Sequence, residues 1–84
     1  MMRRRNNLDI MAEILEIARL GAKKTWIVYR ANLNFKLVKE YLDELMEKRL
    51  LDSDGSIYQT TDQGLEFLEE YRNFKKFRVV VPAR

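Results

Sequence analysis

The stretch from Thr25 to Thr60, TWIVYRANLNFKLVKEYLDELMEKRLLDSDGSIYQT, decides the fold of this chain. Apolar residues in its first half recur at helical spacing and predict two helices, a short one over 26–31 and a longer one over 35–48. Thr25 and Asn34 each precede a helix and belong to the residue types that favour the capping position. The asparagine-rich segment between the helices predicts a tight turn. This half of the stretch is therefore predicted to form a helix-turn-helix unit.

The second half of the stretch predicts a β-hairpin. Leu50-Leu51 begins one strand, and residues 57–60 return antiparallel to it. Asp54-Gly55 lies between the two strands and is typical of primed hairpin turns, because both residues tolerate a positive φ. Two helices, a tight turn and a hairpin in this order are the plan of a winged helix-turn-helix domain. In that plan the second helix of the pair can enter the major groove of DNA.

One further helix is predicted on each side of this unit. Asn7 can cap a first helix that runs to about Leu20, and Gly21 follows its end. A fourth helix is predicted over 61–78. Residues 79–84 are predicted to form either a short edge strand or a frayed tail.

The length of the chain fits a single winged-helix domain over 1–84, in which residues 1–6 form a flexible basic arm. The predicted fold class is α+β and mostly helical, a winged helix-turn-helix with a two-stranded hairpin wing and a C-terminal helix. A domain of this size buries roughly 60% of the surface of its unfolded chain, so it gains from dimerisation.

Apolar residues predict which faces of the two outer helices are buried. In the first helix they form a broad stripe: Leu8, Ile10, Met11, Ile14, Leu15, Ile17, Ala18 and Leu20. In the fourth helix, which Thr61 can cap, Leu65 and Leu68 are predicted to face the core, and Gly64 predicts a close approach of another backbone segment. A second strip of aromatic residues has no obvious place in so small a core and predicts a homodimer interface. Its members are Phe67, Tyr71, Phe74 and Phe77.

Composition argues against an enzyme. The chain has no cysteine and no histidine, which removes disulfides, thiolate chemistry, the commonest metal ligand and the commonest general base. It also has no glycine-rich phosphate loop, and the acids of residues 40–47 are predicted on a solvent face without a pocket. We therefore expect no cofactor, no metal and no catalytic residue.

No apolar run is long enough to span a bilayer, and charges interrupt the first helix where a signal peptide would need an apolar core. The expected location is cytoplasmic, in association with the nucleoid, and no membrane partner is expected.

The net charge is only +3, but the charged residues are distributed unevenly along the chain. Residues 23–39 carry five basic residues and no acid, whereas residues 40–70 carry ten acids and two basic residues. Such separation suits a protein that binds a polyanion, although charge blocks also occur simply as solvated helix faces.

The candidate DNA-binding residues lie in the basic segments of the chain. Lys36 and Lys39 are predicted on the outer side of the third helix, whose second half is acidic, so only its N-terminal turns should enter a groove. The candidates outside the third helix are predicted to contact phosphates. The arginine arm could instead reach a minor groove or remain a solvated tail. These candidates are Lys23, Lys24, Thr25, Arg30 and Asn34, with Arg3, Arg4 and Arg5 in the arm. The tip of the hairpin, residues 52–56, has two acids and no base, unlike a wing that lies on phosphates.

Two segments, GAKKTWIVYRANLN at 21–34 and YQTTDQGLEFL at 58–68, together with Tyr41-Leu42 and Leu50-Leu51, resemble an archaeal winged-helix family. That family includes predicted transcriptional regulators and small Sulfolobus chromatin-type DNA binders. The resemblance covers about residues 6–74 and implies a winged-helix fold, DNA binding, dimerisation through the last helix and an archaeal or archaeal-virus source. Some members extend that helix into a long coiled coil, but Pro82 comes too early here, so a short helix-pair dimer is expected.

The leading hypothesis is a double-stranded DNA-binding protein that acts as a dimeric transcriptional regulator. The alternative is a protein-interaction winged helix of the transcription or replication machinery, which the acidic hairpin and the acidic half of the third helix favour. RNA binding is a third hypothesis.

Overall fold

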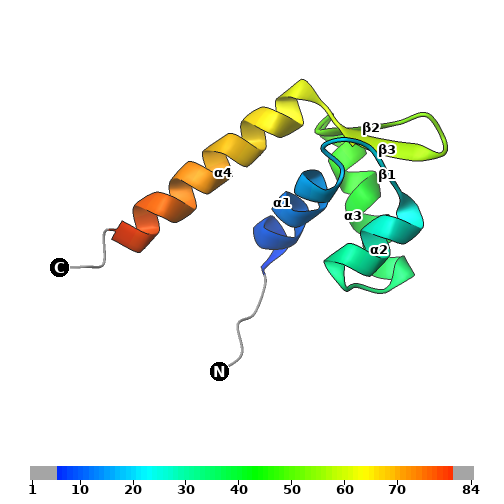
Figure 1. Ribbon diagram of the computed structural model, residues 1–84, viewed down its shortest axis with the longest axis horizontal. Coiled ribbons are helices and arrows are strands. Elements are labelled where there is room, and N and C mark those ends of the chain that lie inside the picture. The colour runs from blue at the N-terminus through cyan, green and yellow to red at the C-terminus, as the bar shows by residue number, and fades with distance from the viewer. Residues whose placement is uncertain (1–5, 81–84) are drawn as a thin grey trace.

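The computed structural model describes the backbone of residues 6–80 and the side chains of residues 6–75. Figure 1 shows a body built from three helices and a small sheet, with a fourth helix that lies beside α1 and extends away from the body. The elements are α1 (Asn7–Ile17), β1 (Ala22–Lys23), α2 (Lys24–Ala31), α3 (Phe35–Glu47), β2 (Leu51–Ser53), β3 (Ile57–Thr60) and α4 (Asp62–Val80). This architecture confirms the predicted fold class.

The core lies where α1, α2 and α3 meet the sheet and the first half of α4. The largest fully buried side chains come from these elements: Ile14, Leu15, Ile27, Val38, Leu42, Leu45 and Leu51. Most of the stripe predicted for the first helix is buried, but Leu8 is half-exposed and Leu20 is 92% exposed. Leu20 lies three residues beyond the end of α1, so helical spacing no longer applies to it.

The start of α1 differs by one residue from the prediction. Asn6, not Asn7, is the N-cap: its side-chain oxygen accepts from the Asp9 amide at 2.8 Å, and the Asp9 carboxylate accepts from the Asn6 amide at 3.4 Å. This reciprocal pair is a capping box, which satisfies two amides that would otherwise lack partners. Gly21, with φ +95°, turns the chain from the end of α1 into β1.

The start of α2 also differs from the prediction, because Lys23 is the N-cap and makes no side-chain capping bond. Thr25 is therefore inside the helix. The reason is the short strand β1, in which Ala22 pairs with Tyr58 and Lys23 with Ile57. The strand continues directly into the helix and leaves no free capping position.

The turn between α2 and α3 forms as expected. Asn32 adopts a left-handed conformation (φ 58°), and the Leu33 amide donates to the Val28 carbonyl at 3.3 Å. Leu33 packs against the core. The side chain of Asn34 accepts from the Leu37 amide at 2.7 Å, which confirms it as the cap of α3.

The sheet has three antiparallel strands in the order β1-β3-β2, so the predicted two-stranded hairpin gains a third strand. The hairpin turn is also different. Gly55 has φ +97°, but Asp54 is not among the residues with positive φ. Instead, the Asp54 amide donates to the Ile57 carbonyl at 3.3 Å, and the Asp54 carboxylate accepts from the amides of Ser56 and Ile57 at 2.9 Å each. Asp54 thus flanks the turn, and Gly55 and Ser56 form its centre.

The first turn of α4 is fixed against the end of α3. The Thr61 hydroxyl accepts from the Gly64 amide at 3.0 Å and donates to the Arg49 carbonyl at 2.8 Å, which confirms its predicted capping role. A Cβ at Gly64 would collide with the Leu50 carbonyl oxygen and with Thr60 Cγ2, so the predicted close approach is also confirmed. α4 stays helical through Val80, which places residues 79 and 80 in the helix rather than in a strand or a tail.

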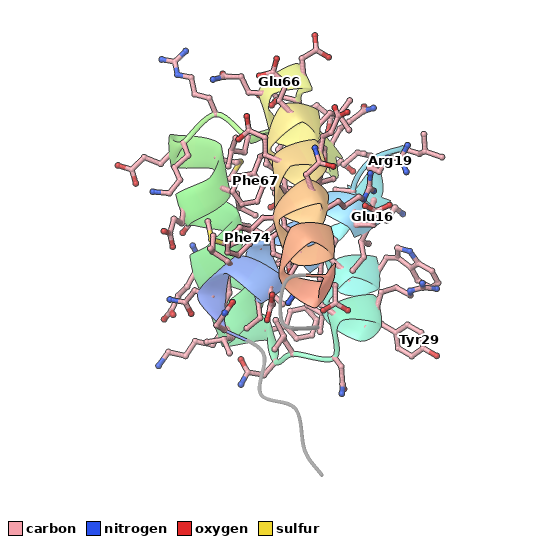
Figure 2. The ribbon with its side chains drawn as sticks, turned by 90° about the vertical axis from the view of Figure 1, so that its left-hand side faces the viewer. Glu16, Arg19, Tyr29, Glu66, Phe67 and Phe74 are labelled. Carbon is pink, nitrogen blue, oxygen red and sulfur yellow. The ribbon has the colours of Figure 1, made fainter. Side chains whose placement is uncertain are left out.

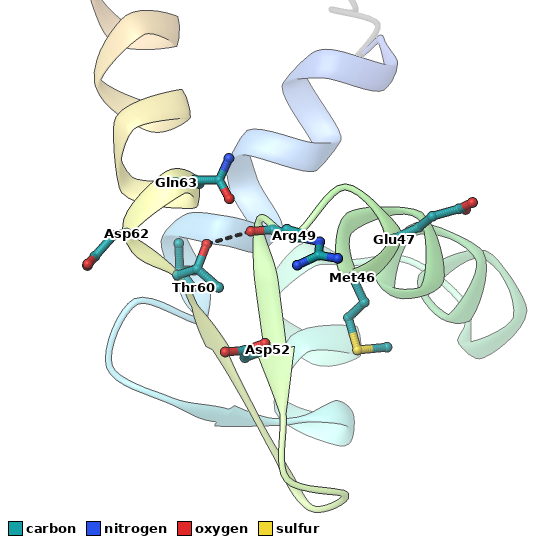
Figure 3. Close-up of a pocket in the computed structure, with 8 residues that line it drawn as sticks. Met46, Glu47, Arg49, Asp52, Thr60, Asp62 and Gln63 are labelled. Carbon is teal, nitrogen blue, oxygen red and sulfur yellow. Dashed lines mark hydrogen bonds between the residues drawn. The ribbon is translucent and has the colours of Figure 1, made fainter.

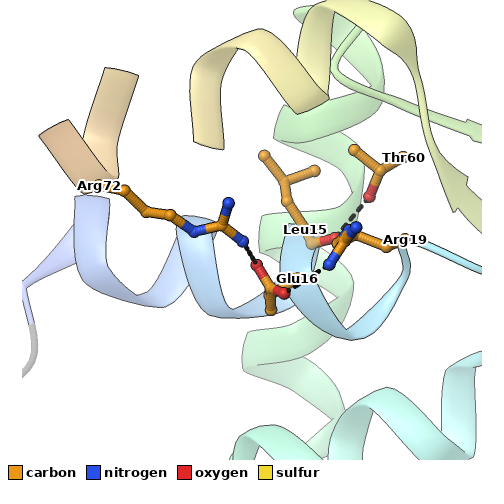
Figure 4. A network of polar contacts seen from close by, with 5 residues as sticks. All are labelled: Leu15, Glu16, Arg19, Thr60 and Arg72. Atoms are coloured by element: carbon orange, nitrogen blue, oxygen red, sulfur yellow. Dashed lines mark hydrogen bonds and ion pairs between the residues drawn. The ribbon is translucent and has the colours of Figure 1, made fainter. Parts of the chain in front are cut away.

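Core contacts of α4 are only partly as predicted. Leu68 is buried, but Leu65 is 41% exposed. Polar contacts join α4 to α1: the Tyr71 hydroxyl donates to the Asp9 carboxylate, and Arg72 pairs with Glu16 at 2.5 Å. Figure 4 shows Glu16 held between Arg72 and Arg19. α4 is therefore fastened along α1 by side chains as well as by the core.

None of the helices within residues 6–80 is both long and apolar enough to cross a membrane.

Candidate nucleic-acid interface

The outer face of α3 begins with exposed basic residues. Val38, Leu42 and Leu45 bury the inner face, which leaves Lys36 and Lys39 on exposed positions in the first two turns. Among the residues that the structure describes, Lys36 takes part in no ion pair, and its ammonium is open to an anionic partner.

Lys39 forms an ion pair with Asp43 at 3.1 Å, one turn along the same helix. Both side chains are more than half exposed, and pairs of this kind contribute only about 0.3–0.5 kcal/mol. The pair therefore does not fix Lys39, and a phosphate can replace Asp43 at small cost. Lys48 and Glu44 form a similar pair at 3.6 Å near the end of the helix, which partly neutralises the acidic half.

The basic residues around α2 fall into two sets. Lys23, Lys24 and Thr25 lie at the start of the helix, where Lys23 and Thr25 are exposed and Lys24 is half-buried. Arg30 lies one turn beyond Trp26, and its guanidinium stands over the indole ring at 5.5 Å from the centroid.

Arg30 thus belongs to a cluster that the sequence did not predict. From the sequence, Trp26 and Tyr29 could stack on bases, although helical spacing favours a core or interface position. Trp26 is 48% exposed and Tyr29 is 74% exposed, so neither belongs to the core. The one available signal was position: Ile27 and Ala31 bury the inner face of this short helix, which turns residues 26, 29 and 30 outward.

The hairpin presents negative charge at its tip. The residues from Asp52 to Ser56 are all exposed. Hydrogen bonds from the Ile57 and Ser56 amides lower the pKa of the Asp54 carboxyl, so it stays ionised. A phosphate placed against this tip would be repelled by the Asp54 carboxylate. In this respect the hairpin differs from wings that contact the DNA backbone.

The aromatic residues predicted to form one strip on α4 differ in how far they are buried. Phe67 and Tyr71 are half-buried and pack against the core of their own chain, so the small domain does have a place for them. Phe74 is 56% exposed. Figure 2 shows Phe67 and Phe74 on the same side of α4. The side chain of Phe77 lies outside the described residues, as do Arg3, Arg4 and Arg5.

A polar groove of about 770 Å³ separates the end of α3 from β2 and the start of α4 (Figure 3). Its lining is Met46, Glu47, Arg49, Asp52, Thr60, Thr61, Asp62 and Gln63. No group of three or more acidic side chains within the described part of the chain is arranged to hold a metal ion. The groove does not include the candidate lysines.

Comparison with known proteins identifies the family. The sequence model of the winged helix-turn-helix family matches residues 4–79. The chain belongs to the winged helix-turn-helix family.

Two archaeal proteins are similar to this winged helix-turn-helix chain. The crystal structure of Sso10a-2, a DNA-binding protein from Sulfolobus solfataricus, superposes with a TM-score of 0.79 at 27% sequence identity, over 88% of this chain and 82% of that one. An uncharacterized protein of Methanocaldococcus jannaschii is 30% identical over 82 residues, which are 96% of this chain and 38% of that protein. The chain thus spans less than two-fifths of that relative. These matches confirm the predicted resemblance to archaeal winged-helix proteins.

Proposed function

We propose that this winged-helix domain binds double-stranded DNA through the N-terminal turns of α3, which enter the major groove. The observation that carries the proposal is Lys36, which is exposed at the start of the second helix of the helix-turn-helix and has no ion pair among residues 6–75. The structural likeness to Sso10a-2, a DNA-binding protein, supports it.

The charge along α3 sets how deeply the helix enters the groove. Lys36 and Lys39 face outward at its start, whereas Asp43 and Glu47 are exposed farther along. The phosphates that border the groove attract the first pair and repel the second. The helix therefore points its N-terminal end at the base pairs, and Asn34 lies beside the phosphates or base edges.

Phosphate contacts at the start of α2 complete the interface. Lys23, Lys24 and Thr25 hold the domain on the backbone of one strand, and the arginine arm of residues 3–5 adds further contacts. Each phosphate neutralised contributes about −0.9 to the slope of log affinity against log salt concentration. Affinity for any duplex sequence is therefore high at low salt and falls steeply as salt is raised.

We further propose that two copies pair through α4 and act as a transcriptional regulator. The exposed ring of Phe74 supports this, because an apolar side chain that is 56% exposed gains from burial against a second copy. A twofold pair would place two α3 helices on one face of a duplex, about one helical turn apart. Phe74→Glu should shift the sedimentation coefficient toward that of a single copy, and an unchanged dimer would refute this role of α4.

The test of duplex binding compares two lysines of the same helix. A labelled random duplex of about two helical turns is titrated by fluorescence anisotropy at two salt concentrations. Lys36→Ala is expected to weaken binding and to reduce the salt slope by about 0.9. Lys48→Ala is the matched control, because it removes an exposed lysine at the other end of α3 and should change little. Equal effects of the two variants, or no binding at low salt, would contradict the proposal.

A protein-interaction module is the second candidate, and the acidic hairpin tip favours it. Asp52 and Asp54 are exposed, and Asp54 stays ionised. A stoichiometric protein partner whose binding depends on these carboxylates, with no duplex binding at low salt, would establish this function instead.

A further inference from the structure

The outer face of α2 carries three planar side chains in contact. The ring centroids of Trp26 and Tyr29 lie 5.6 Å apart with an angle of 31° between the rings. The Arg30 guanidinium covers the indole at 5.5 Å. We call these three residues the stacking face. Figure 2 shows Tyr29 projecting from the body on the opposite side from Phe74.

These rings are not part of the core. Ile27 and Ala31 supply the buried face of α2, with no exposed surface, whereas Trp26 and Tyr29 are 48% and 74% exposed. Exposed aromatic rings lose the free energy that burial would provide, and a group of them commonly marks a binding surface. The guanidinium over the indole makes a cation–π contact that favours this arrangement of the two side chains.

The chain segment that carries the stacking face is basic. No acid occurs between Glu16 and Glu40 in the sequence, and Lys23 and Lys24 directly precede α2. An open hollow of about 460 Å³ borders the Trp26 side chain. Its lining is Gly21, Ala22, Lys23, Thr25, Trp26 and Ile57. A ligand for this surface must therefore carry negative charge and offer flat faces for stacking.

We propose that the stacking face binds the unpaired bases of single-stranded DNA. Bases in a duplex are already stacked on one another, so their faces are hidden from a protein surface, whereas a single strand exposes them. Trp26 and Tyr29 receive neighbouring bases, Arg30 adds a cation over the stack, and Lys23 and Lys24 attract the phosphates. An acidic peptide matches the charge but does not supply a row of planar rings. This site goes beyond the proposed duplex binding: the two share Lys23 and Lys24, but the stacking face adds the outer side of α2, whereas duplex binding depends on Lys36 in α3.

The chain contains one tryptophan, which gives a direct readout. Stacking of a base on Trp26 quenches its fluorescence, so the full chain is titrated with a thymidine oligonucleotide of about six residues at low salt. Strong quenching that saturates is expected. Tyr29→Ala and Arg30→Ala should each weaken binding at least about fivefold, because each removes one stacking or cation contact.

The controls separate stacking from charge and from loss of the fold. Tyr29→Phe keeps the ring and should bind like the unmodified chain. Leu8→Ala removes an exposed apolar side chain on α1 and should also leave oligonucleotide binding unchanged. Far-ultraviolet circular dichroism checks that every variant is folded. Lys36→Ala should reduce duplex affinity without reducing the quenching.

Several results would overturn the proposal. These are an absence of quenching at low salt, equal affinity of Tyr29→Ala and the unmodified chain, and a loss of affinity in Leu8→Ala as large as that in Tyr29→Ala. Tighter binding of a uridine ribonucleotide of the same length would reassign the surface to RNA. Quenching by the oligonucleotide in a chain that fails to bind duplex would support the stacking face and refute only the proposed duplex binding.

Discussion

Replacing Gly64 with alanine tests the junction between the hairpin and α4. The added Cβ would collide with the Leu50 carbonyl oxygen and with Thr60 Cγ2, and the first of these is backbone that cannot rotate away. The start of α4 must therefore move. That movement strains two hydrogen bonds, from the Thr61 amide to Leu50 at 3.1 Å and from the Thr61 hydroxyl to Arg49 at 2.8 Å.

The expected loss follows from three contributions. Overpacking costs about 1–3 kcal/mol, and weakening the two hydrogen bonds adds about 1 kcal/mol. Alanine gains about 1 kcal/mol over glycine as a helix former. The net destabilisation is about 2 kcal/mol. A domain of this length is stable by roughly 4–12 kcal/mol, so the change is large, and Tm should fall by about 8–16 °C.

Urea unfolding followed by circular dichroism measures this difference. Gln63→Ala is the matched control, because it changes the preceding exposed residue of the same helical turn and should alter stability by less than about 0.5 kcal/mol. Gly55→Ala provides a second comparison: open space surrounds that position, and only its φ of +97° opposes a side chain. A Gly64→Ala variant as stable as the unmodified chain would refute the steric account of the junction.

Three further predictions concern stability. Asn34→Ala should cost about 1 kcal/mol through loss of the N-cap of α3, measured by urea unfolding, and an unchanged midpoint would count against the cap. Thr60→Val should cost about 1–3 kcal/mol, because it removes the buried hydroxyl that donates to the Leu15 carbonyl at 2.6 Å, and calorimetry with no loss in Tm would contradict this. The hydrogen bond from Tyr71 lowers the pKa of Asp9 below its ordinary 3.8, so its stabilising effect is present above that pH and is lost as pH falls through the lowered value. The stability difference between the unmodified chain and Asp9→Asn should therefore shrink in acid, and a difference independent of pH would exclude this linkage.

Periodicity and turn chemistry were enough to predict the helix-turn-helix and the hairpin. The stripe around Val38 and Leu42 repeats over a long helix, and Asn34 is a strong local capping signal. These features depend on neighbours in the sequence, so the sequence contains the necessary information. Gly64 was also predictable, because a glycine inside a helical pattern needs a steric reason.

Features set by distant contacts were not predictable in the same way. β1 has two residues and forms only because β3 lies beside it, and this pairing removed Thr25 from the cap of α2. Tyr71 looked like an interface residue because the sequence does not show that Asp9 lies opposite it.

At the candidate site, the sequence located the lysines but not their partners. The exposure of Lys36 and the pairing of Lys39 with Asp43 depend on side-chain geometry. Lys39 has an acid one turn along the helix with which it forms an ion pair. The contact between Arg30 and Trp26 was missed for a different reason. The positions of Ile27 and Ala31 place both residues on the outer face of α2, but whether their side chains meet depends on rotamers that the sequence does not show.

The residues at the end of α3 also determine how motion passes through the molecule. The Arg49 and Leu50 carbonyls both accept hydrogen bonds from Thr61, and Leu50 blocks any closer approach of Gly64. This junction is a rigid connection between α3 and α4. A partner that binds the far end of α4 therefore also fixes the orientation of α3.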